Sequence, residues 1–343
     1  MPFAKLLITW YLNNKRDLPW RDTTDPYLIW LSEIMLQQTR VAQGLPYFLT
    51  FSEHFPTVSD LARADEQQVL RLWQGLGYYS RARNLHQTAK YIAFELAGKF
   101  PENYHDLLKL KGVGDYTAAA IASFAYGEAV PVVDGNVFRV LSRYFGIESD
   151  IAQQATKKEF TALAAELMPP DSAALFNQAI MEFGALQCTP KNPDCDTCPL
   201  NDGCLAVKYN KVSQLPVKSK KSQSKSRYFS YLVYEDESGH TMIQKRTAKD
   251  IWHNLYEFPL VESVSAQADL SKVIESAMEK QDIISVKTLD SKATTHKLTH
   301  QSLHIRFVSV KVRGRLADGV AVADLEAYPF PIVLANFIKN HWK

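Results

Sequence analysis

The four cysteines of this 343-residue chain all lie within residues 188–204, and this clustering strongly constrains what that segment can form. Their spacing is C-x6-C-x2-C-x5-C, and the thiols are those of Cys188, Cys195, Cys198 and Cys204. Two disulfides inside so short a loop are geometrically awkward, and a chain of this length buries a core without them. The spacing therefore indicates a metal-binding loop.

The identity of the metal group follows from the uneven spacing. Zinc sites with four cysteines usually combine two C-x2-C pairs, whereas only Cys195 and Cys198 form such a pair here. Iron–sulfur clusters accept uneven spacings. Three prolines, at positions 190, 193 and 199, stiffen the turns of the loop. We therefore favour an iron–sulfur cluster over zinc, with disulfides as the least favoured alternative.

The composition is that of an ordinary globular protein, with 46% hydrophobic and 22% charged residues, and the length predicts two or three domains. The longest uncharged apolar run, residues 116–127, is too short to span a membrane. At the N-terminus, Lys5 and the polar residues 13–16 do not fit a signal peptide. We expect a cytoplasmic protein without a membrane partner.

The periodicity of apolar residues changes along the chain. Residues 1–210 read as helical; for example, Asp25 followed by Pro26 predicts the start of a helix that runs to residue 37. Residues 228–234 and 303–312 are β-rich, an amphipathic helix is expected around residues 270–277, and residues 332–338 predict a closing helix. The predicted fold is a mainly α N-terminal part followed by an α+β domain at 228–343.

Residues 211–227 separate these two parts. They contain several lysines and serines and no acidic residue, which is typical of a solvated linker. The net charge of +2 is too small to require a nucleic-acid partner, so any DNA-binding prediction depends on local motifs.

One such motif lies at residues 107–121, where Gly112 and Gly114 separate an apolar helix end from a new helical segment. Bare backbone amides at the start of a helix suit a phosphate oxygen, and Lys111 stands next to them. Taken alone, the two glycines fit a tight turn between helices better than a phosphate site.

The order of motifs resembles the endonuclease III superfamily of DNA glycosylases. This order is the helix-hairpin-helix at 107–121, then Val-Val-Asp-Gly-Asn-Val at 132–137, then the four-cysteine loop. Within it, Leu-Pro-Trp-Arg at 18–21 and Ser-Glu-Ile-Met-Leu-Gln-Gln-Thr-Arg-Val at 32–41 resemble the adenine DNA glycosylase (MutY) family. The resemblance implies two helical subdomains, a [4Fe-4S] cluster and a monomer. It also implies a double-stranded DNA partner with adenine opposite 8-oxoguanine or guanine.

The expected chemistry is cleavage of the bond between adenine and deoxyribose, which requires an acid for the base and an anion for the developing cation. Glu33 lies in an apolar helical segment that favours its protonated form, so by resemblance it protonates adenine N7. Asp134 follows an apolar run and is expected both to cap a helix and, by resemblance, to stabilise the sugar cation with support from Asn136 and Tyr116.

Tyr116 also separates two branches of the superfamily. In the lyase branch a lysine stands two residues after the second hairpin glycine and forms a Schiff base with the sugar. A phenol cannot form an imine, so we expect base removal without strand cleavage.

The resemblance also implies residues that hold the DNA and the everted base. Arg21 and Gln178 match positions of the adenine pocket. Other positions match residues that wedge into the duplex, stack beside the lesion or bind phosphate, namely Gln38, Thr39, Leu76, Tyr78, Lys111, Gly112 and Gly114.

The C-terminal part resembles a Nudix-like domain through residues 251–259. The segment 265–280 lacks the glutamate cluster of Nudix hydrolases, so we expect no pyrophosphatase activity. The lesion-reading loop implied by the resemblance is Leu298, Thr299 and His300, in which Leu298 replaces the usual phenylalanine.

Two alternatives remain open. The first is a glycosylase and lyase for oxidised pyrimidines, which Tyr116 and the additional C-terminal domain disfavour. The second is an iron–sulfur protein that binds DNA without catalysis, which the joint presence of Glu33 and Asp134 disfavours.

Overall fold

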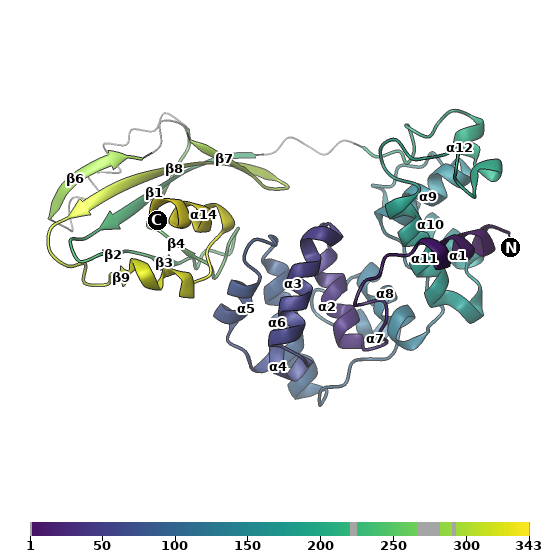
Figure 1. Cartoon of the computed structure of the whole chain (residues 1–343), viewed down its shortest axis with the longest axis horizontal. Coiled ribbons are helices and arrows are strands. Elements are labelled where there is room, and N and C mark those ends of the chain that lie inside the picture. Colours follow the sequence, from purple (N-terminus) through teal and green to yellow (C-terminus); the bar gives the residue numbers. More distant parts are fainter. Residues whose placement is uncertain (1, 220–224, 266–281, 290–292, 343) are drawn as a thin grey trace. The chain divides into compact units, whose positions relative to one another are not determined.

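The computed structural model describes residues 2–219, 225–265, 282–289 and 293–342, and the chain forms two units (Figure 1). The first unit comprises Met1–Arg63 and Asn84–Lys220, and the second comprises Ala64–Arg83 and Lys221–Lys343. The predicted boundary differs, because it assigned all of residues 1–210 to the helical part. Residues 64–83 group with the C-terminal part through hydrogen bonds such as Phe330 N to Gln74 Oε1, at 2.9 Å.

The first unit is helical. Its helices are α1 (Pro2–Asn14), α2 (Pro26–Leu36), α3 (Val41–His54), α4 (Val58–Arg63), α6 (Ser80–Glu95, from residue 84), α7 (Tyr104–Leu107), α8 (Asp115–Tyr126), α9 (Gly135–Phe145), α10 (Gln154–Leu167), α11 (Ala173–Leu186) and α12 (Leu205–Lys208), with 3-10 turns η1 (Pro170–Ser172) and η2 (Asn201–Gly203). The predicted start of α2 is confirmed, because the Asp25 side chain accepts a hydrogen bond from Tyr27 N, with Pro26 in the first turn.

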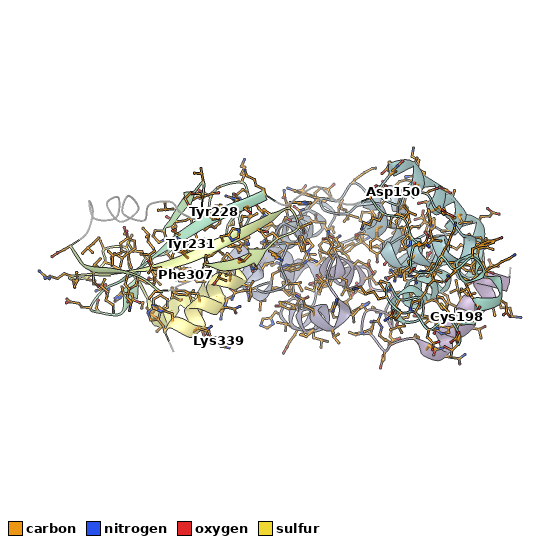
Figure 2. All side chains as sticks on the ribbon, turned by 90° about the horizontal axis from the view of Figure 1, so that it is seen from above. Asp150, Cys198, Tyr228, Tyr231, Phe307 and Lys339 are labelled. Atoms are coloured by element: carbon orange, nitrogen blue, oxygen red, sulfur yellow. The ribbon has the colours of Figure 1, made fainter. Side chains whose placement is uncertain are left out.

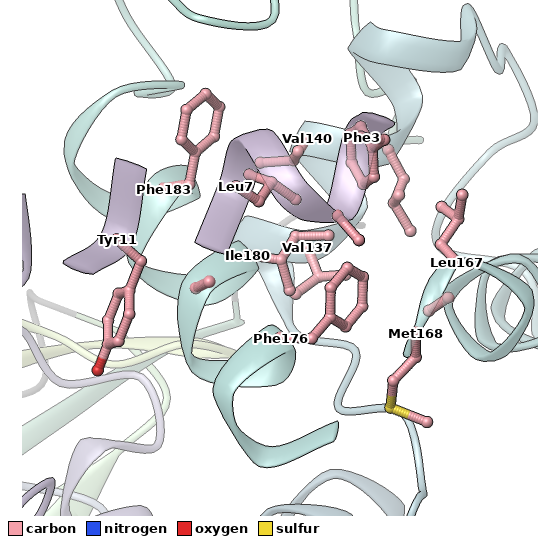
Figure 3. Close-up of a cluster of buried hydrophobic side chains, with 14 of the residues drawn as sticks. Phe3, Leu7, Tyr11, Val137, Val140, Leu167, Met168, Phe176, Ile180 and Phe183 are labelled. Atoms are coloured by element: carbon pink, nitrogen blue, oxygen red, sulfur yellow. The ribbon is translucent and has the colours of Figure 1, made fainter. Parts of the chain in front are cut away.

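One hydrophobic core of this unit joins helices that are distant in sequence. Phe3 and Leu7 of α1, Val137 and Val140 of α9, and Phe176 of α11 meet in one buried cluster (Figure 3). Helix α11 contacts both α1 and α9. This packing fixes the start of α9, where Asp134 stands, relative to α11.

The second unit contains α5 (Glu66–Leu72), the first residues of α6 and an α+β domain. The main sheet has strand order β5-β1-β8-β6, and β7 also pairs with β8. Strands β1 (Lys225–Glu235) and β8 (Gln301–Val312) are parallel, with Tyr231 opposite Phe307. The antiparallel partners are β5 (Leu260–Ser263), β6 (Ile283–Thr288) and β7 (Thr294–Lys297). Two small sheets pair β2 (His240–Thr241) with β9 (Val320–Ala321), and β3 (Gln244–Lys245) with β4 (Tyr256–Glu257).

The last helix, α14 (Ile332–His341), packs on this sheet, and the 3-10 turn η3 (Val322–Ala327) precedes it. Phe337 of α14 stacks on Phe307 with ring centroids 3.7 Å apart. Tyr231 and Phe307 lie on neighbouring strands, as Figure 2 shows, with their rings stacked at 6.0 Å. The predicted class, a helical part followed by an α+β domain, is therefore confirmed.

The predicted linker at 211–227 is shorter in the structure. Leu215 is buried, and its carbonyl accepts a hydrogen bond from Arg143 Nε at 3.1 Å, so the beginning of this segment packs on the helical unit. At the other end, β1 already begins at Lys225 because its backbone pairs with β8. The amphipathic helix expected at residues 270–277 lies outside the described residues.

Candidate functional site

A cavity in the helical unit brings together both predicted carboxyl groups. Glu33 of α2 and Asp134 at the start of α9 line it, and both also line a neighbouring groove. The other predicted catalytic and base-pocket residues that line this cavity are Arg21, Tyr116, Asn136 and Gln178. Residues separated by more than 150 positions thus converge on one site of about 480 Å³.

Glu33 is buried, with 6% of its surface exposed, because α2 is apolar on nearly every side. Burial raises the pKa of its carboxyl from 4.5 to about 7, and the hydrogen bond from Tyr116 opposes this rise. The Tyr116 hydroxyl donates to Glu33 Oε2 at 2.7 Å. Burial also raises the pKa of Tyr116 well above its usual value, so the phenol stays a donor. A carboxyl group of this kind carries a transferable proton near neutral pH.

Asp134 is the N-cap of α9. Its Oδ1 accepts hydrogen bonds from the backbone nitrogens of Asn136 and Val137, each at 2.8 Å, and its Oδ2 accepts from Asn136 Nδ2 at 2.8 Å. Burial raises the pKa of Asp134, while these hydrogen bonds and the charge of Arg139 oppose the rise. The predicted cap is confirmed, and all three described partners are donors, which suits a carboxylate anion.

The orientation of the Asn136 amide is fixed by Arg139. Arg139 Nη2 donates to Asn136 Oδ1 at 2.8 Å, and a guanidinium can only donate. The amide NH2 of Asn136 must therefore face Asp134. Gly184 of α11 makes this arrangement possible, because a Cβ there would lie 2.6 Å from Asn136 Cβ. Close approach of α11 thus requires glycine at this position.

Sequence reasoning missed Glu182, which is central to the same cavity. Its Oε2 accepts hydrogen bonds from Arg16 Nη2 and Arg21 Nη2, both at 2.6 Å. Burial alone raises the pKa of Glu182, but the two guanidinium groups outweigh burial and bring it to about 2. Glu182 is therefore an anion that positions Arg21. Its signal in the sequence was the same as that of Glu33, a lone acid in an apolar helical run.

Gln178 lies one turn before Glu182 on α11 and also faces the cavity. Its Oε1 accepts a hydrogen bond from the Tyr11 hydroxyl at 2.7 Å, which orients the amide NH2 away from Tyr11. The cavity is thus lined by amide, guanidinium and carboxyl groups, which suit a ligand with both hydrogen-bond donors and acceptors.

The predicted hairpin is present between α7 and α8. Gly112 has φ +79°, and a Cβ there would lie 2.9 Å from Asn84 Cβ, so this turn requires glycine. Gly114 is the N-cap of α8 without a side-chain cap, so the turn leaves backbone amides at the helix start. Lys111 Nζ donates to Gln87 Oε1 at 2.5 Å, at the edge of the hairpin.

The groove beside the cavity of Glu33 and Asp134 extends from this hairpin to α10. Gly114 and Asp115 line one side, and Lys157 and Lys158 of α10 line another. Both lysines are exposed, and no ion pair involves either of them among the described residues. Gln38, an expected wedge, lines the groove with a left-handed φ of 56°. Thr39 follows it and lines the cavity itself.

The remaining DNA-contact predictions fall in the second unit. Tyr78 is 45% exposed, and its hydroxyl contacts the Thr299 hydroxyl. Thr299 and His300 are exposed in the turn between β7 and β8. Leu76, expected to probe the duplex, is instead 4% exposed because its side chain belongs to the buried core. Of Leu76 and Tyr78, only Tyr78 is exposed on the surface.

The four cysteines surround one small pocket between α11 and α12, and Cys198 is labelled in Figure 2. Within the part of the chain that the structure describes, no three His, Cys, Asp or Glu side chains are grouped closely enough for a single metal ion. Arg143 Nη1 lies 3.4 Å from Cys188 Sγ, so a cation stands beside the thiols. Four sulfurs around a shared pocket fit a cluster, which would fasten the loop through its iron–thiolate bonds.

Two arginines of α9 connect this loop to the start of the helix that Asp134 caps. Arg139 Nε donates to the Cys188 carbonyl at 2.7 Å, while its Nη2 holds Asn136. Arg143 donates to the Thr189 carbonyl at 2.8 Å. The cysteine loop and the Asp134 cap therefore share one helix and one hydrogen-bond network.

Among the described residues, every helix is too short or too polar to cross a bilayer.

Three protein families match segments of this chain. Residues 31–170 match the HhH-GPD superfamily of base excision DNA repair proteins, and residues 230–340 match the NUDIX domain. Residues 188–204 match the iron–sulfur binding domain of endonuclease III. This match supports the predicted iron–sulfur cluster over the zinc alternative. The segment 265–280, predicted to lack hydrolase glutamates, lies outside the described residues except for Ser265.

Solved structures give the same fold for the helical part. The chain is 29% identical to a thermostable thymine-DNA glycosylase, with a TM-score of 0.56 over 61% of this chain and 96% of that one. A non-covalent endonuclease III–DNA complex is 21% identical with a TM-score of 0.53, over 61% of this chain and 95% of that one, which shows the fold alone.

Two adenine DNA glycosylases match long segments of this chain. The adenine DNA glycosylase of Buchnera aphidicola subsp. Schizaphis graminum is 38% identical over 306 residues, which are 88% of this chain and 86% of the relative. The human adenine DNA glycosylase is 43% identical over 222 residues, 62% of this chain and 41% of the relative. With the motifs, the fold and the paired carboxyl groups in agreement, the chain belongs to the adenine DNA glycosylase family.

Proposed function

We propose that this enzyme removes adenine opposite 8-oxoguanine or guanine in double-stranded DNA by hydrolysis, as a monomer, and leaves the strand intact. The observation that carries this proposal is the cavity shared by Glu33, whose pKa is about 7, and Asp134, whose described hydrogen-bond partners are all donors. The Glu33 carboxyl group can donate a proton, and the Asp134 carboxylate can stabilise a cation.

The reaction proceeds in two parts. Glu33 gives its proton to N7 of the everted adenine, the bond from the base nitrogen to C1′ breaks, and adenine leaves with the bonding electrons. Asp134 stabilises the cation at C1′ until a water oxygen bonds there, and the proton that this water loses restores the acid form of Glu33. Tyr116 supports Glu33 through its hydrogen bond. Asn136 supports Asp134 in the same way.

The other assigned residues position the substrate. Arg21 and Gln178 bind the edge of adenine from one wall of the cavity. The hairpin amides at Gly112 and Gly114, with Lys111, hold a phosphate. Gln38 and Thr39 act at the duplex beside the everted base, and Tyr78, Thr299 and His300 read the opposing 8-oxoguanine. The iron–sulfur cluster is of the [4Fe-4S] type, in keeping with its four cysteines.

Single-turnover assays test this function. With duplexes that carry adenine opposite 8-oxoguanine, guanine or cytosine, we expect free adenine to appear fastest opposite 8-oxoguanine. The strand should remain uncut until alkali is added, because Tyr116 stands where a lyase has lysine. Cleavage before alkali treatment would support the lyase alternative. Binding of the duplex without release of any base would support the non-catalytic one.

Lys157 and Lys158 provide a test of the groove as the DNA path. If both bind phosphates, the double variant K157Q/K158Q should flatten the dependence of log Kobs on log salt by about 0.9 for each phosphate that is no longer neutralised. The matched control is K5Q/K99Q, which removes two exposed lysines that line neither cavity nor groove. Equal slopes for the two double variants, measured by fluorescence anisotropy, would contradict a path along α10.

A further inference from the structure

The turn that displays Tyr78 has an unusual backbone. Gly75, Gly77 and Tyr78 all have positive φ, of 99°, 78° and 49°. A tyrosine avoids the left-handed region, because its Cβ crowds the backbone there, and such residues persist only where their surroundings hold them. Neighbouring groups must therefore hold Tyr78 in place.

Arg81, three residues after Tyr78, makes several contacts with the turn at residues 75–78. Its Nη2 donates to the Leu76 carbonyl at 3.3 Å and to the Gly77 carbonyl at 3.1 Å. Its guanidinium carbon lies 5.4 Å from the ring centroid of Tyr78 and 5.3 Å from that of Trp73. Trp73 Nε1 also donates to the Gly77 carbonyl, at 3.0 Å. The Arg81 guanidinium thus contacts both the backbone carbonyl groups of the turn and the exposed ring of Tyr78.

Arg81 is not placed to bind DNA directly. Only 8% of its surface is exposed, and burial lowers the pKa of its guanidinium to about 10. Burying a cation is costly, so a buried arginine is expected where its contacts have a specific use. A guanidinium can fix the orientation of the carbonyl groups and aromatic rings that it contacts, and Arg81 contacts both at this turn.

We propose that Arg81 is a positioning residue that clips the turn at 75–78 and so presents the ring of Tyr78 to the base opposite adenine. This inference rests on the proposed function, which assigns lesion reading to Tyr78. The opposite end of the Tyr78 side chain contacts Thr299, so the ring is held both at its face and at its hydroxyl. Pre-organised groups lose less freedom when they bind, so the clip improves discrimination.

The first measurement tests the clip without any activity. We expect hydrogen exchange of the amides at residues 75–79 to become at least about tenfold faster in Arg81→Met, because the strained turn loses its hold. The control is Arg71→Met, which removes an exposed arginine from the same unit. Unchanged protection of this turn in Arg81→Met would overturn the inference.

The second measurement tests what the clip does. Single-turnover rates give the preference for adenine opposite 8-oxoguanine over adenine opposite guanine. We expect Arg81→Met to lower this ratio about tenfold, and Arg81→Met combined with Tyr78→Ala to lower it no further than Tyr78→Ala alone, since both act through one ring. Loss of folded protein alone would reduce both rates equally. Additive effects of the two substitutions would overturn the inference.

The two failures are distinguishable. If Tyr78→Ala leaves the ratio unchanged, the lesion-reading role proposed for Tyr78 is wrong, and the ratio no longer bears on Arg81. The exchange measurement then still decides whether Arg81 holds the turn. Arg81→Lys separates charge from shape, because lysine keeps the charge but lacks the planar guanidinium that lies over the rings of Trp73 and Tyr78. We expect it to restore the ratio only in part.

Discussion

Replacing Glu33 with glutamine is expected to slow single-turnover release of adenine by about 10²- to 10⁴-fold, the usual contribution of a general acid. Glutamine has nearly the same shape, and its amide oxygen can still accept the hydrogen bond that Tyr116 donates to Glu33 Oε2. What it lacks is a proton that can pass to N7. The reduction in rate therefore isolates proton transfer from packing.

The pH profile provides a second result from the same pair of proteins. Burial raises the pKa of Glu33 to about 7, so the acid form is present below that pH and is lost as the pH rises through it. The rate of the unmodified enzyme should fall above about pH 7. Glu33→Gln should show a slow rate without this decline. A decline of the same form in both proteins would assign the titration to another group.

The stability of Glu33→Gln is the control for misfolding, because the substitution is expected to raise stability while it lowers activity. In the unfolded chain Glu33 loses its proton near its ordinary value of 4.5, whereas in the folded chain it loses it near 7. The contribution of Glu33 to stability is therefore present below about pH 4.5 and is lost as the pH rises to about 7. Above that pH, Glu33→Gln should be more stable than the unmodified enzyme, by up to about 3 kcal/mol. An inactive protein that resists denaturant better cannot owe its inactivity to misfolding.

Local signals explain which parts of the fold were predictable. The pair Asp25 and Pro26 carries its own start signal, so the beginning of α2 could be predicted and was found. Asp134 followed by glycine likewise predicted the cap of α9. The two strands β1 and β8 were recognisable from β-branched and aromatic residues. In each case the interactions that form the element lie within a few residues.

Nonlocal interactions explain what was missed. The burial of Glu182 depends on guanidinium groups more than 160 positions away, and the sequence does not show that they meet it. Arg139 reads as an ordinary helical arginine, although it holds both Asn136 and the cysteine loop. The sequence likewise does not show that tertiary packing buries Leu76. Residues 64–83 read as one more helical segment, but their hydrogen bonds place them with the second unit.

Replacing Asp134 with asparagine is expected to reduce the rate by at least about 10²- to 10³-fold, because the charge that faces the forming cation is removed. Asparagine remains a good N-cap, and its Oδ1 can accept from the backbone nitrogens of Asn136 and Val137 as the carboxylate does. The start of α9 should therefore survive, with a small change in melting temperature.

The substitution Asp134→Asn also affects the hydrogen bond between the side chains of residues 134 and 136. Arg139 donates to Asn136 Oδ1, so the Asn136 amide cannot turn, and its NH2 faces Oδ2 of Asp134. In the variant two NH2 groups meet there, so the hydrogen bond between the side chains of residues 134 and 136 is lost. Rates measured across pH should stay low at every value, since asparagine does not titrate. Near-normal release of adenine by a folded Asp134→Asn protein would mean that no anion is needed at this position, and the two-carboxyl mechanism would then be wrong.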